Sequence, residues 1–373
     1  MEHEFLLYDG ISDDALKGGN STEFEFSDYG QRVVVATLYL IAAVLGIIGN
    51  SLVIWAVILS RKLRTTTNAF VVNLSVADLL TSLVIPWDAV ALLGKNGPPV
   101  SEWLCSVVSA IQTITTGCSI YTLAFIGVQR LLLITRPATN YQAIYTPRYK
   151  FVVWLVVAWS IPVLVTLIPP LLGVGGLGYN PKYHHCGFKS SHPLSSYYNS
   201  IIAGALYPVP LAIIILCYTL IWCYLNRHTK RMVNPPEKSG DSSITSSAVS
   251  LELKSVTSKT KSQSDLRRAG TVSHPQMNRR QNEITKNMFY VVCAFVLCLT
   301  PFAICLFYEY SDPALPYASV TLVFNACVNP LIYATKHRDF KAVFACILRR
   351  RWSSIPEPSD FLKATRRSRC CRH

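Results

Sequence analysis

Charged residues are scarce in this sequence of 373 residues. Only 15% are Asp, Glu, Lys or Arg and 51% are hydrophobic, whereas soluble domains carry about 25% charged residues. The mean hydropathy is +0.31. The N-terminus also lacks the basic region and long apolar stretch of a cleaved signal peptide, so we expect the first apolar segment to direct membrane insertion. The composition predicts a membrane protein.

Long apolar segments account for this composition. A helix of about 20 residues crosses the hydrocarbon core of a bilayer, and a lipid-exposed backbone must satisfy its own hydrogen bonds, which favours helices. The sequence therefore predicts an all-α membrane protein, a seven-transmembrane helix bundle. Its spans are expected near 33–59, 67–93, 102–135, 150–172, 197–225, 285–309 and 315–335.

Basic residues are nearly absent from one side of these spans. With the N-terminus outside, the outer segments contain only five of the 35 Lys and Arg residues: Lys17, Arg32, Lys95, Lys182 and Lys189. Inner loops are enriched in Lys and Arg, so we expect a multi-pass plasma-membrane protein, in contact with lipids, whose N-terminus is extracellular. The net charge of +14 reflects this topology and does not indicate nucleic-acid binding.

The segments outside the spans define three parts of the chain. We expect a disordered extracellular tail over 1–32, with a glycosylation acceptor at Asn20 in Asn-Ser-Thr. The helix bundle covers 33–335 and includes an inner loop, 226–284, whose Ser, Thr and Lys content predicts disorder. The cytoplasmic part, 336–373, begins with apolar residues at helical spacing, which predicts a short amphipathic eighth helix (Phe340, Val343, Phe344 and Ile347).

The 12 cysteines separate by topology. Only Cys105 and Cys186 lie on the oxidising outer side, so the sequence predicts a disulfide between them. Three others are cytosolic and lie near basic residues, which makes them candidates for palmitoylation: Cys346, Cys370 and Cys371.

Polar residues inside the spans are few, and they recur on single helix faces. Asp78 lies in an apolar run, where a carboxylate costs roughly 2.5 kcal/mol or more and is expected to face the protein interior. Such residues can also serve only to hold membrane helices together. The other members of the set are Asn50 in the first span, Gln112, Thr116, Ser119 and Arg130 in the third, and Asn325, Asn329 and Tyr333 in the seventh.

Together these motifs resemble the span signatures of rhodopsin-like G-protein-coupled receptors, in the correct order over roughly 30–350. The resemblance is carried by Gly49-Asn50, Asn73-Leu74-Ser75-Val76-Ala77-Asp78-Leu79, Cys105 with Arg130, Trp159, Pro210 with Tyr218, Pro301 and Asn329-Pro330-Leu331-Ile332-Tyr333. Within that family the layout is similar to the melatonin-like and orphan receptors.

The resemblance implies roles for these positions. Asp78 with Ser119, Asn325 and Asn329 matches the family's pocket for an allosteric sodium ion, and no other cofactor is expected. Arg130 matches the arginine that contacts the G protein, and Tyr218 and Tyr333 match two tyrosines that move inward on activation. Arrestin and receptor kinases are the further partners that the family implies.

Two departures from the family pattern concern restraints on the resting state. Gln129 stands where the family usually has an acidic residue before Arg130, so a charge-assisted contact is lost. Leu299 stands where the family usually has a Trp before Pro301. We therefore expect raised basal signalling.

Two further positions argue against particular ligands. Gln112 stands where amine receptors carry an Asp, which argues against a simple biogenic amine, and Val323 stands where opsins carry the retinal-binding Lys. We expect a small, largely apolar ligand with one or two hydrogen-bonding groups, although a peptide is not excluded. The pocket candidates are Trp87, Asp88, Gln112, Thr113, Thr116, Phe302, Leu306 and Tyr310. His184 and His185, beside Cys186, could overlook the pocket, but they are interpreted as loop residues.

Other functions have weaker support in the sequence. The spans contain no His and no close carboxylate pair, so an enzyme is not expected. An ion-coupled transporter or channel using Asp78 is the alternative, but the sequence shows no inverted repeat. The prediction is a receptor that transmits the binding of an extracellular ligand to heterotrimeric G proteins.

Overall fold

The computed structural model describes residues 24–95, 97–135, 148–233 and 273–364. The predicted modification sites Asn20, Cys370 and Cys371 lie outside these ranges. The long helices are α1 (Tyr29–Leu59), α2 (Thr66–Leu92), α3 (Glu102–Thr135), α5 (Arg148–Leu171), α6 (Ser195–Leu206), α7 (Pro208–Val233), α9 (Ser273–Phe307) and α10 (Leu315–Lys336). The short elements are η2 (Arg61–Leu63), β1 (Leu177–Asn180), β2 (His185–Phe188), η3 (Glu309–Ala314), α11 (Arg338–Leu348) and η4 (Trp352–Ser354).

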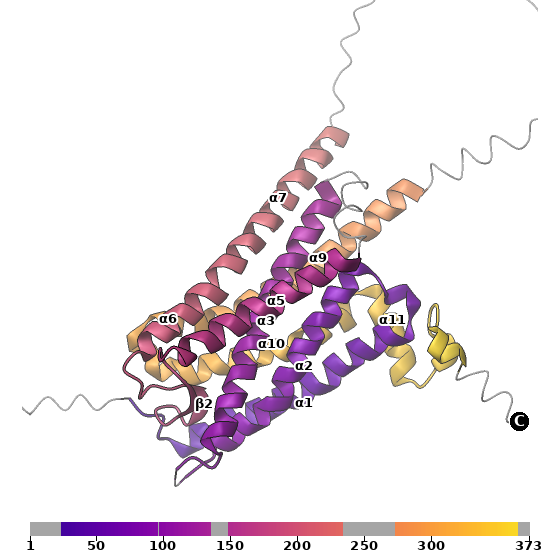
Figure 1. Cartoon of the computed structure of the whole chain (residues 1–373). Coiled ribbons are helices and arrows are strands. Elements are labelled where there is room, and N and C mark those ends of the chain that lie inside the picture. The colour runs from indigo at the N-terminus through magenta and orange to yellow at the C-terminus, as the bar shows by residue number, and fades with distance from the viewer. Residues whose placement is uncertain (1–23, 96, 136–147, 234–272, 365–373) are drawn as a thin grey trace, which may run out of the picture.

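The helices form one elongated bundle (Figure 1). In the described ranges, seven helical segments are long and apolar enough to cross a membrane. Because these segments coincide with the expected spans, the predicted fold class is confirmed. The amphipathic eighth helix is present as α11, which packs Phe340, Val343 and Phe344 into the bundle. The end of the bundle with α6 and β2 is the predicted outer end, and α11 lies near the inner end (Figure 1).

The fifth span, expected near 197–225, is confirmed as one membrane-crossing segment, Ser195–Arg227. Within it a single turn residue, Tyr207, separates α6 from α7, which begins at Pro208. Proline has no backbone N–H and clashes with the preceding turn, so Pro208 interrupts the helical hydrogen bonding at this point. Apolar content does not reveal such a break.

The inner loop 226–284 contains more helix than predicted. α7 continues to Val233 and α9 already begins at Ser273, well before the apolar part of the sixth span. The sequence between 276 and 283 is rich in Gln, Arg and Glu, which are good helix formers. Hydropathy finds the membrane-crossing part of a helix and misses its extension into water. Residues 234–272 lie outside the described part of the chain.

The predicted disorder of the tail 1–32 is wrong for its last residues. Asp28 caps α1 by accepting hydrogen bonds from the backbone N–H groups of Gly30 and Gln31. Phe26 is buried, and its backbone N–H donates to the carbonyl of Lys182 in the outer loop at 2.8 Å. The end of the tail is therefore attached to the outer loop, and the rest, 1–23, lies outside the described residues.

The long outer loop contains an antiparallel hairpin that the sequence analysis did not predict. Strands β1 and β2 pair in the register Leu177↔Phe188 to Asn180↔His185. The turn contains Asn180-Pro181, a dipeptide typical of turns, and that dipeptide could have revealed it. The predicted disulfide joins Cys105 of α3 to Cys186 of β2, so the hairpin lies across the outer end of the bundle.

The segment after α11 packs back against the end of α1 and the loop that follows it. Arg61 N–H donates to the carbonyl of Glu357, and Ser359 N–H donates to the carbonyl of Leu59 at 2.9 Å. Ile355 and Leu362 are buried there. The predicted palmitoylation site Cys346 is partly exposed on α11.

A partly buried hydrogen-bond chain ties the middle of the bundle together. The indole Nε1–H of Trp159 in α5 donates to Oδ1 of Asn73 in α2 at 2.9 Å. The amide of Asn73 in turn donates to Oγ1 of Thr122 in α3 at 2.8 Å. Lipid cannot form hydrogen bonds with these three side chains, so each side chain depends on its partner in a neighbouring helix.

Replacing Trp159 by Phe removes the indole donor and leaves the Asn73 oxygen without its partner. We expect the free energy of unfolding to fall by about 1–3 kcal/mol, measured as a lower midpoint of thermal unfolding in detergent. The matched control is Trp87→Phe, because the Trp87 side chain is 46% exposed on the bundle surface. Equal losses in the two variants would contradict this role of Trp159.

Candidate functional site

The carboxylate of Asp78 lies at the centre of the bundle and is only 3% exposed. Its Oδ1 accepts a hydrogen bond from the hydroxyl of Ser119 in α3 at 3.2 Å. Its Oδ2 accepts one from the amide of Asn329 in α10 at 2.8 Å. Three helices therefore meet at one carboxylate, and the structure brings together three of the residues that the sequence grouped as a switch.

Asn50 joins α1 to this cluster through a carbonyl that proline leaves free. Pro330 has no N–H to donate to the carbonyl of Ala326, four residues earlier in α10. The amide of Asn50 donates to that carbonyl at 2.7 Å. Gly49 makes the approach possible, because a side chain there would lie 2.8 Å from Pro330. The Gly49-Asn50 pair thus fits the proline position in α10.

Several buried oxygens around Asp78 have no hydrogen-bond partner in the protein. They are Oδ1 of Asn50, Oγ of Ser75, Oδ1 of Asn325 and Oδ1 of Asn329. One carboxylate and several neutral oxygens form a donor set that suits a hard monovalent cation. The described residues contain no group of three or more His, Cys, Asp or Glu that could hold a metal ion, so the set does not resemble a transition-metal centre.

At the inner end, the residues predicted to contact the G protein are buried in the bundle. Arg130 and Gln129 of α3 are both buried. The ring of Tyr218 in α7 lies 5.5 Å from that of Phe289 in α9. Tyr333 is fully buried and stacks on Phe340 of α11, with ring centroids 5.5 Å apart. Tyr333 thus links the end of the seventh span to the amphipathic helix.

A cavity of about 120 Å³, here called the deep cavity, lies in the outer half of the bundle. Leu299 of α9 lines it, and Phe295, four residues earlier on the same helix, is buried. Six of the eight predicted pocket residues line this cavity: Asp88, Gln112, Thr113, Thr116, Phe302 and Leu306.

The other two predicted pocket residues do not join them. Trp87 is not among the lining residues, and its side chain is exposed on the bundle surface. Neighbouring residues of an α-helix point about 100° apart, so the inward direction of Asp88 turns Trp87 away. Tyr310 lies in η3, but its side chain is outside the described part of the structure.

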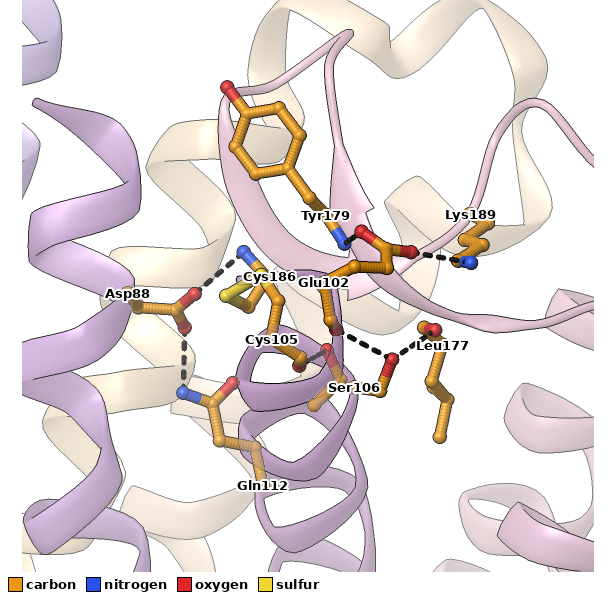
Figure 2. Close-up of a disulfide and its surroundings, with 10 residues drawn as sticks. Asp88, Glu102, Cys105, Ser106, Gln112, Leu177, Tyr179, Cys186 and Lys189 are labelled. Atoms are coloured by element: carbon orange, nitrogen blue, oxygen red, sulfur yellow. Dashed lines mark hydrogen bonds and ion pairs between the residues drawn. A yellow bond between two sulfur atoms is a disulfide. The ribbon is translucent and has the colours of Figure 1, made fainter. Parts of the chain in front are cut away.

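Asp88 connects the deep cavity to the outer loop (Figure 2). Its Oδ2 accepts a hydrogen bond from the amide of Gln112 at 2.6 Å, and its Oδ1 accepts one from the backbone N–H of Cys186 at 2.8 Å. Cys186 is the loop partner of the disulfide. The sequence marked Asp88 and Gln112 only as pocket candidates, and nothing in the local sequence indicates that they are bonded to each other.

A second set of contacts fixes the hairpin on α3. Glu102 forms an ion pair with Lys189 at 2.5 Å and accepts a hydrogen bond from the backbone N–H of Tyr179 at 3.3 Å. The hydroxyl of Ser106 donates to the carbonyl of Leu177 at 2.8 Å (Figure 2). These contacts hold β1, and the residue that follows β2, against the same helix that carries Cys105.

A larger and more polar cavity of about 400 Å³, here called the outer cavity, lies between the hairpin, α6 and the outer end of α9. His185, Phe188, Phe302 and Leu306 line both cavities. The interpretation of His185 as an ordinary loop residue therefore needs correction. Burial, and then the neighbouring His184, lower the pKa of His185 to about 4, so it is neutral at physiological pH.

Comparison with known proteins decides the family. The pattern of the 7 transmembrane receptor (rhodopsin family) matches residues 49–333. The chain belongs to this receptor family. It is similar to somatostatin receptor type 1 of Rattus norvegicus, with 25% identity over 91% of this chain and 78% of the relative. It is also similar to melatonin receptor type 1A of Ovis aries, with 28% identity over 84% of this chain and 77% of the relative.

Other relatives extend the same similarity. The alpha-1D adrenergic receptor of Mus musculus is 30% identical over 87% of this chain and 60% of the relative. The crystal structure of squid rhodopsin has the same fold, with a TM-score of 0.69 and 20% identity over 92% of both chains. The expected relation to rhodopsin-like receptors, with melatonin receptors among the relatives, is confirmed.

Family membership decides between the two functions that the sequence left open. This protein is a multi-pass G-protein-coupled receptor, in a family of receptors rather than of enzymes. The transporter interpretation of Asp78 has no support in these comparisons. The receptor transmits ligand binding to heterotrimeric G proteins.

The neutral His185, which is half-buried between the two cavities, gives a pH-dependent contribution to stability. Its folded-state pKa is lower than the 6.5 of a free histidine, so the folded state resists protonation. The contribution of His185 to stability is fully present above pH 6.5 and is lost as the pH falls from 6.5 towards 4. We expect His185→Gln to reduce the loss of thermal stability between these pH values, measured by unfolding of the purified receptor.

The matched control for this experiment is His192→Gln, in the same outer loop but outside both cavities. It should lose stability with falling pH as the wild type does. If His185→Gln and the wild type lost the same thermal stability between pH 6.5 and 4, His185 would not be the cause of that loss.

Proposed function

We propose that this receptor binds a compact extracellular small molecule in the deep cavity and acts at the plasma membrane with its N-terminus outside. The observation that carries the proposal is the cavity itself, which lies between α2, α3, α9 and α10 beneath the disulfide-linked strand β2. Its volume favours a small molecule over a peptide, since a peptide would have to extend into the outer cavity. The names of the relatives indicate different ligands, so sequence identity alone does not select a ligand for this receptor.

The polar cluster around Asp78 is proposed as the element that transmits binding. Ligand contacts from α3 and α10 lie on the same helices that hold the Asp78 carboxylate. A helix displacement at the cavity therefore changes the geometry at Asp78. At the inner end, Gln129, Arg130, Tyr218 and Tyr333 are the proposed G-protein-coupling residues. Two conformations of the bundle, shifted by the ligand at one end and by the G protein at the other, explain how the two sites are coupled without direct contact.

Sodium binding at Asp78 is part of this proposal. The residues fit the ion, since Asp78 supplies a carboxylate and Ser75, Asn325 and Asn329 contribute buried neutral oxygens. The ion would supply a positive charge that stabilises the resting arrangement of α2, α3 and α10. In the absence of an acidic neighbour at position 129, we propose that this cluster is the main restraint on the resting state.

Several other predicted features belong to the proposal. Glycosylation at Asn20 and palmitoylation at Cys346, Cys370 and Cys371 agree with an outer N-terminus and an inner C-terminus. The partly exposed thiol of Cys346 on α11 is compatible with an acyl chain at the inner leaflet. Arrestin and receptor kinases are the proposed regulatory partners.

The receptor, reconstituted in nanodiscs with a panel of purified heterotrimeric G proteins, should accelerate nucleotide exchange without added ligand. Gln129→Asp should lower this basal rate by roughly 10- to 150-fold, because a charge-assisted contact to Arg130 contributes roughly 1.5–3 kcal/mol to the resting state. Gln31→Asp, at the outer end of α1, is the matched control and should leave the rate unchanged. Ion flux in liposomes without nucleotide exchange on any G protein would overturn the receptor function.

The sodium site can be tested without knowing the ligand. Sodium chloride should raise the midpoint of thermal unfolding above its value in potassium chloride at equal ionic strength. A free sodium concentration ten times the Kd contributes roughly 1.4 kcal/mol. Asp78→Asn should abolish the difference, whereas Asp312→Asn, on the outer surface, should keep it. A sodium effect that survives in Asp78→Asn would contradict the assignment.

A further inference from the structure

The deep cavity contains one charged side chain among its described lining residues, the carboxylate of Asp88, and no cationic one. We propose that the cavity binds an organic cation, a small ammonium compound with an apolar body, and that Asp88 of α2 is its counter-ion. This inference rests on the proposed function of the deep cavity as the ligand site and names the ligand's chemical class.

The basic residues on the outer side that the structure describes are engaged elsewhere. Arg32 donates to the carbonyl of Gly94 at 3.1 Å, and the Lys95 ammonium lies over the ring of Tyr29, 4.4 Å from its centroid. The other two form ion pairs, Lys182 with Asp312 at 2.6 Å and Lys189 with Glu102 at 2.5 Å. No described cation pairs with Asp88, so the cavity keeps an uncompensated carboxylate.

The carboxylate of Asp88 has room for a further donor. It is only 2% exposed and accepts one hydrogen bond on each oxygen, from Gln112 and from the Cys186 N–H. An ionised carboxylate offers about four acceptor positions. About two therefore remain, on a group that also lines the cavity. Both present donors are neutral, and a buried charge is costly unless a cation compensates it.

The remaining walls of the deep cavity fit the rest of such a ligand. They are mainly aromatic and aliphatic, with Phe188, Ile202, Leu206 and Phe302 among them. A neutral ligand would leave the carboxylate unpaired, and an anionic ligand would be repelled by it. An ammonium group next to an aromatic or aliphatic body satisfies both parts of the cavity.

This inference removes the reason for excluding an amine. The sequence argued against an amine because position 112 is Gln where amine receptors carry Asp. In the structure the carboxylate is supplied one helix away, and the Gln112 amide donates to it at 2.6 Å. Gln112 therefore positions the carboxylate rather than replacing it.

Three probes that differ mainly in charge test the proposal: phenethylamine, 2-phenylethanol and 3-phenylpropanoate, each at the same millimolar concentration. The readout is the thermal unfolding midpoint of the purified full-length receptor. We expect phenethylamine to raise the midpoint by roughly 2–4 °C, and the neutral and anionic probes to have no such effect. Asp88→Asn should abolish the preference for the amine, and Asp88→Glu should restore it.

A matched control locates the effect within the protein. Asp312→Asn removes a carboxylate that lines the outer cavity and should keep the amine preference. The proposal is overturned if the wild type shows no amine-specific shift, if the preference survives in Asp88→Asn, or if Asp312→Asn removes it instead. If Asp88→Asn does not fold, the comparison of the three probes on the wild type and on Asp88→Glu still tests the proposal.

The thermal-shift experiment tests the cation site, and the nucleotide-exchange experiment tests G-protein coupling, so the two proposals can fail separately. An amine-specific shift without nucleotide exchange on any G protein would support the cation site and overturn the coupling function. Nucleotide exchange without an amine preference would leave the coupling function intact and overturn the cation site.

Discussion

The constraint on which the rest of this structure depends is the burial of the Asp78 carboxylate in the middle of a membrane bundle. Hydrocarbon supplies neither water nor a counter-ion, so the protein has to satisfy the group from within. It does so with Ser119 from α3 and Asn329 from α10. These contacts draw three helices together at one point, and Asn50 adds α1 through the carbonyl that Pro330 leaves free. Any movement of one helix therefore alters the partners of the carboxylate.

Asp78 and Asp88 lie on the same helix, ten residues or about 15 Å apart. Asp88 is fixed by Gln112 and by the disulfide-linked Cys186, and Asp78 by the partners named above. One carboxylate thus lines the deep cavity, whereas the other lies in the proposed switch. A cation at the outer position and a sodium ion at the inner one would act on the same helix. If each ion favours a different arrangement of α2, their binding is linked, and each weakens the other by the same factor.

The sequence predicted the features that depend on periodicity and topology. The seven spans, the Cys105–Cys186 disulfide and the amphipathic α11 follow from apolar length, loop location and helical spacing, and the resemblance to rhodopsin-like receptors grouped Asp78 with Ser119 and Asn329. Local geometry was harder to predict, because hydropathy does not show the break before Pro208 or the extensions of α7 and α9. Trp87 was misplaced because a list of polar and aromatic residues ignores the direction in which each one points. The bond between Asp88 and the Cys186 N–H joins residues 98 positions apart, which no local pattern reveals.

The central claim is that the Asp78 cluster restrains the receptor in its resting state. The most direct test is the basal rate of G-protein nucleotide exchange catalysed by the reconstituted receptor, in sodium chloride and in potassium chloride at equal ionic strength. Sodium should slow exchange by the wild type and have no effect on exchange by Asp78→Asn. Equal sodium sensitivity in the two proteins would contradict the claim, because the restraint would then lie elsewhere.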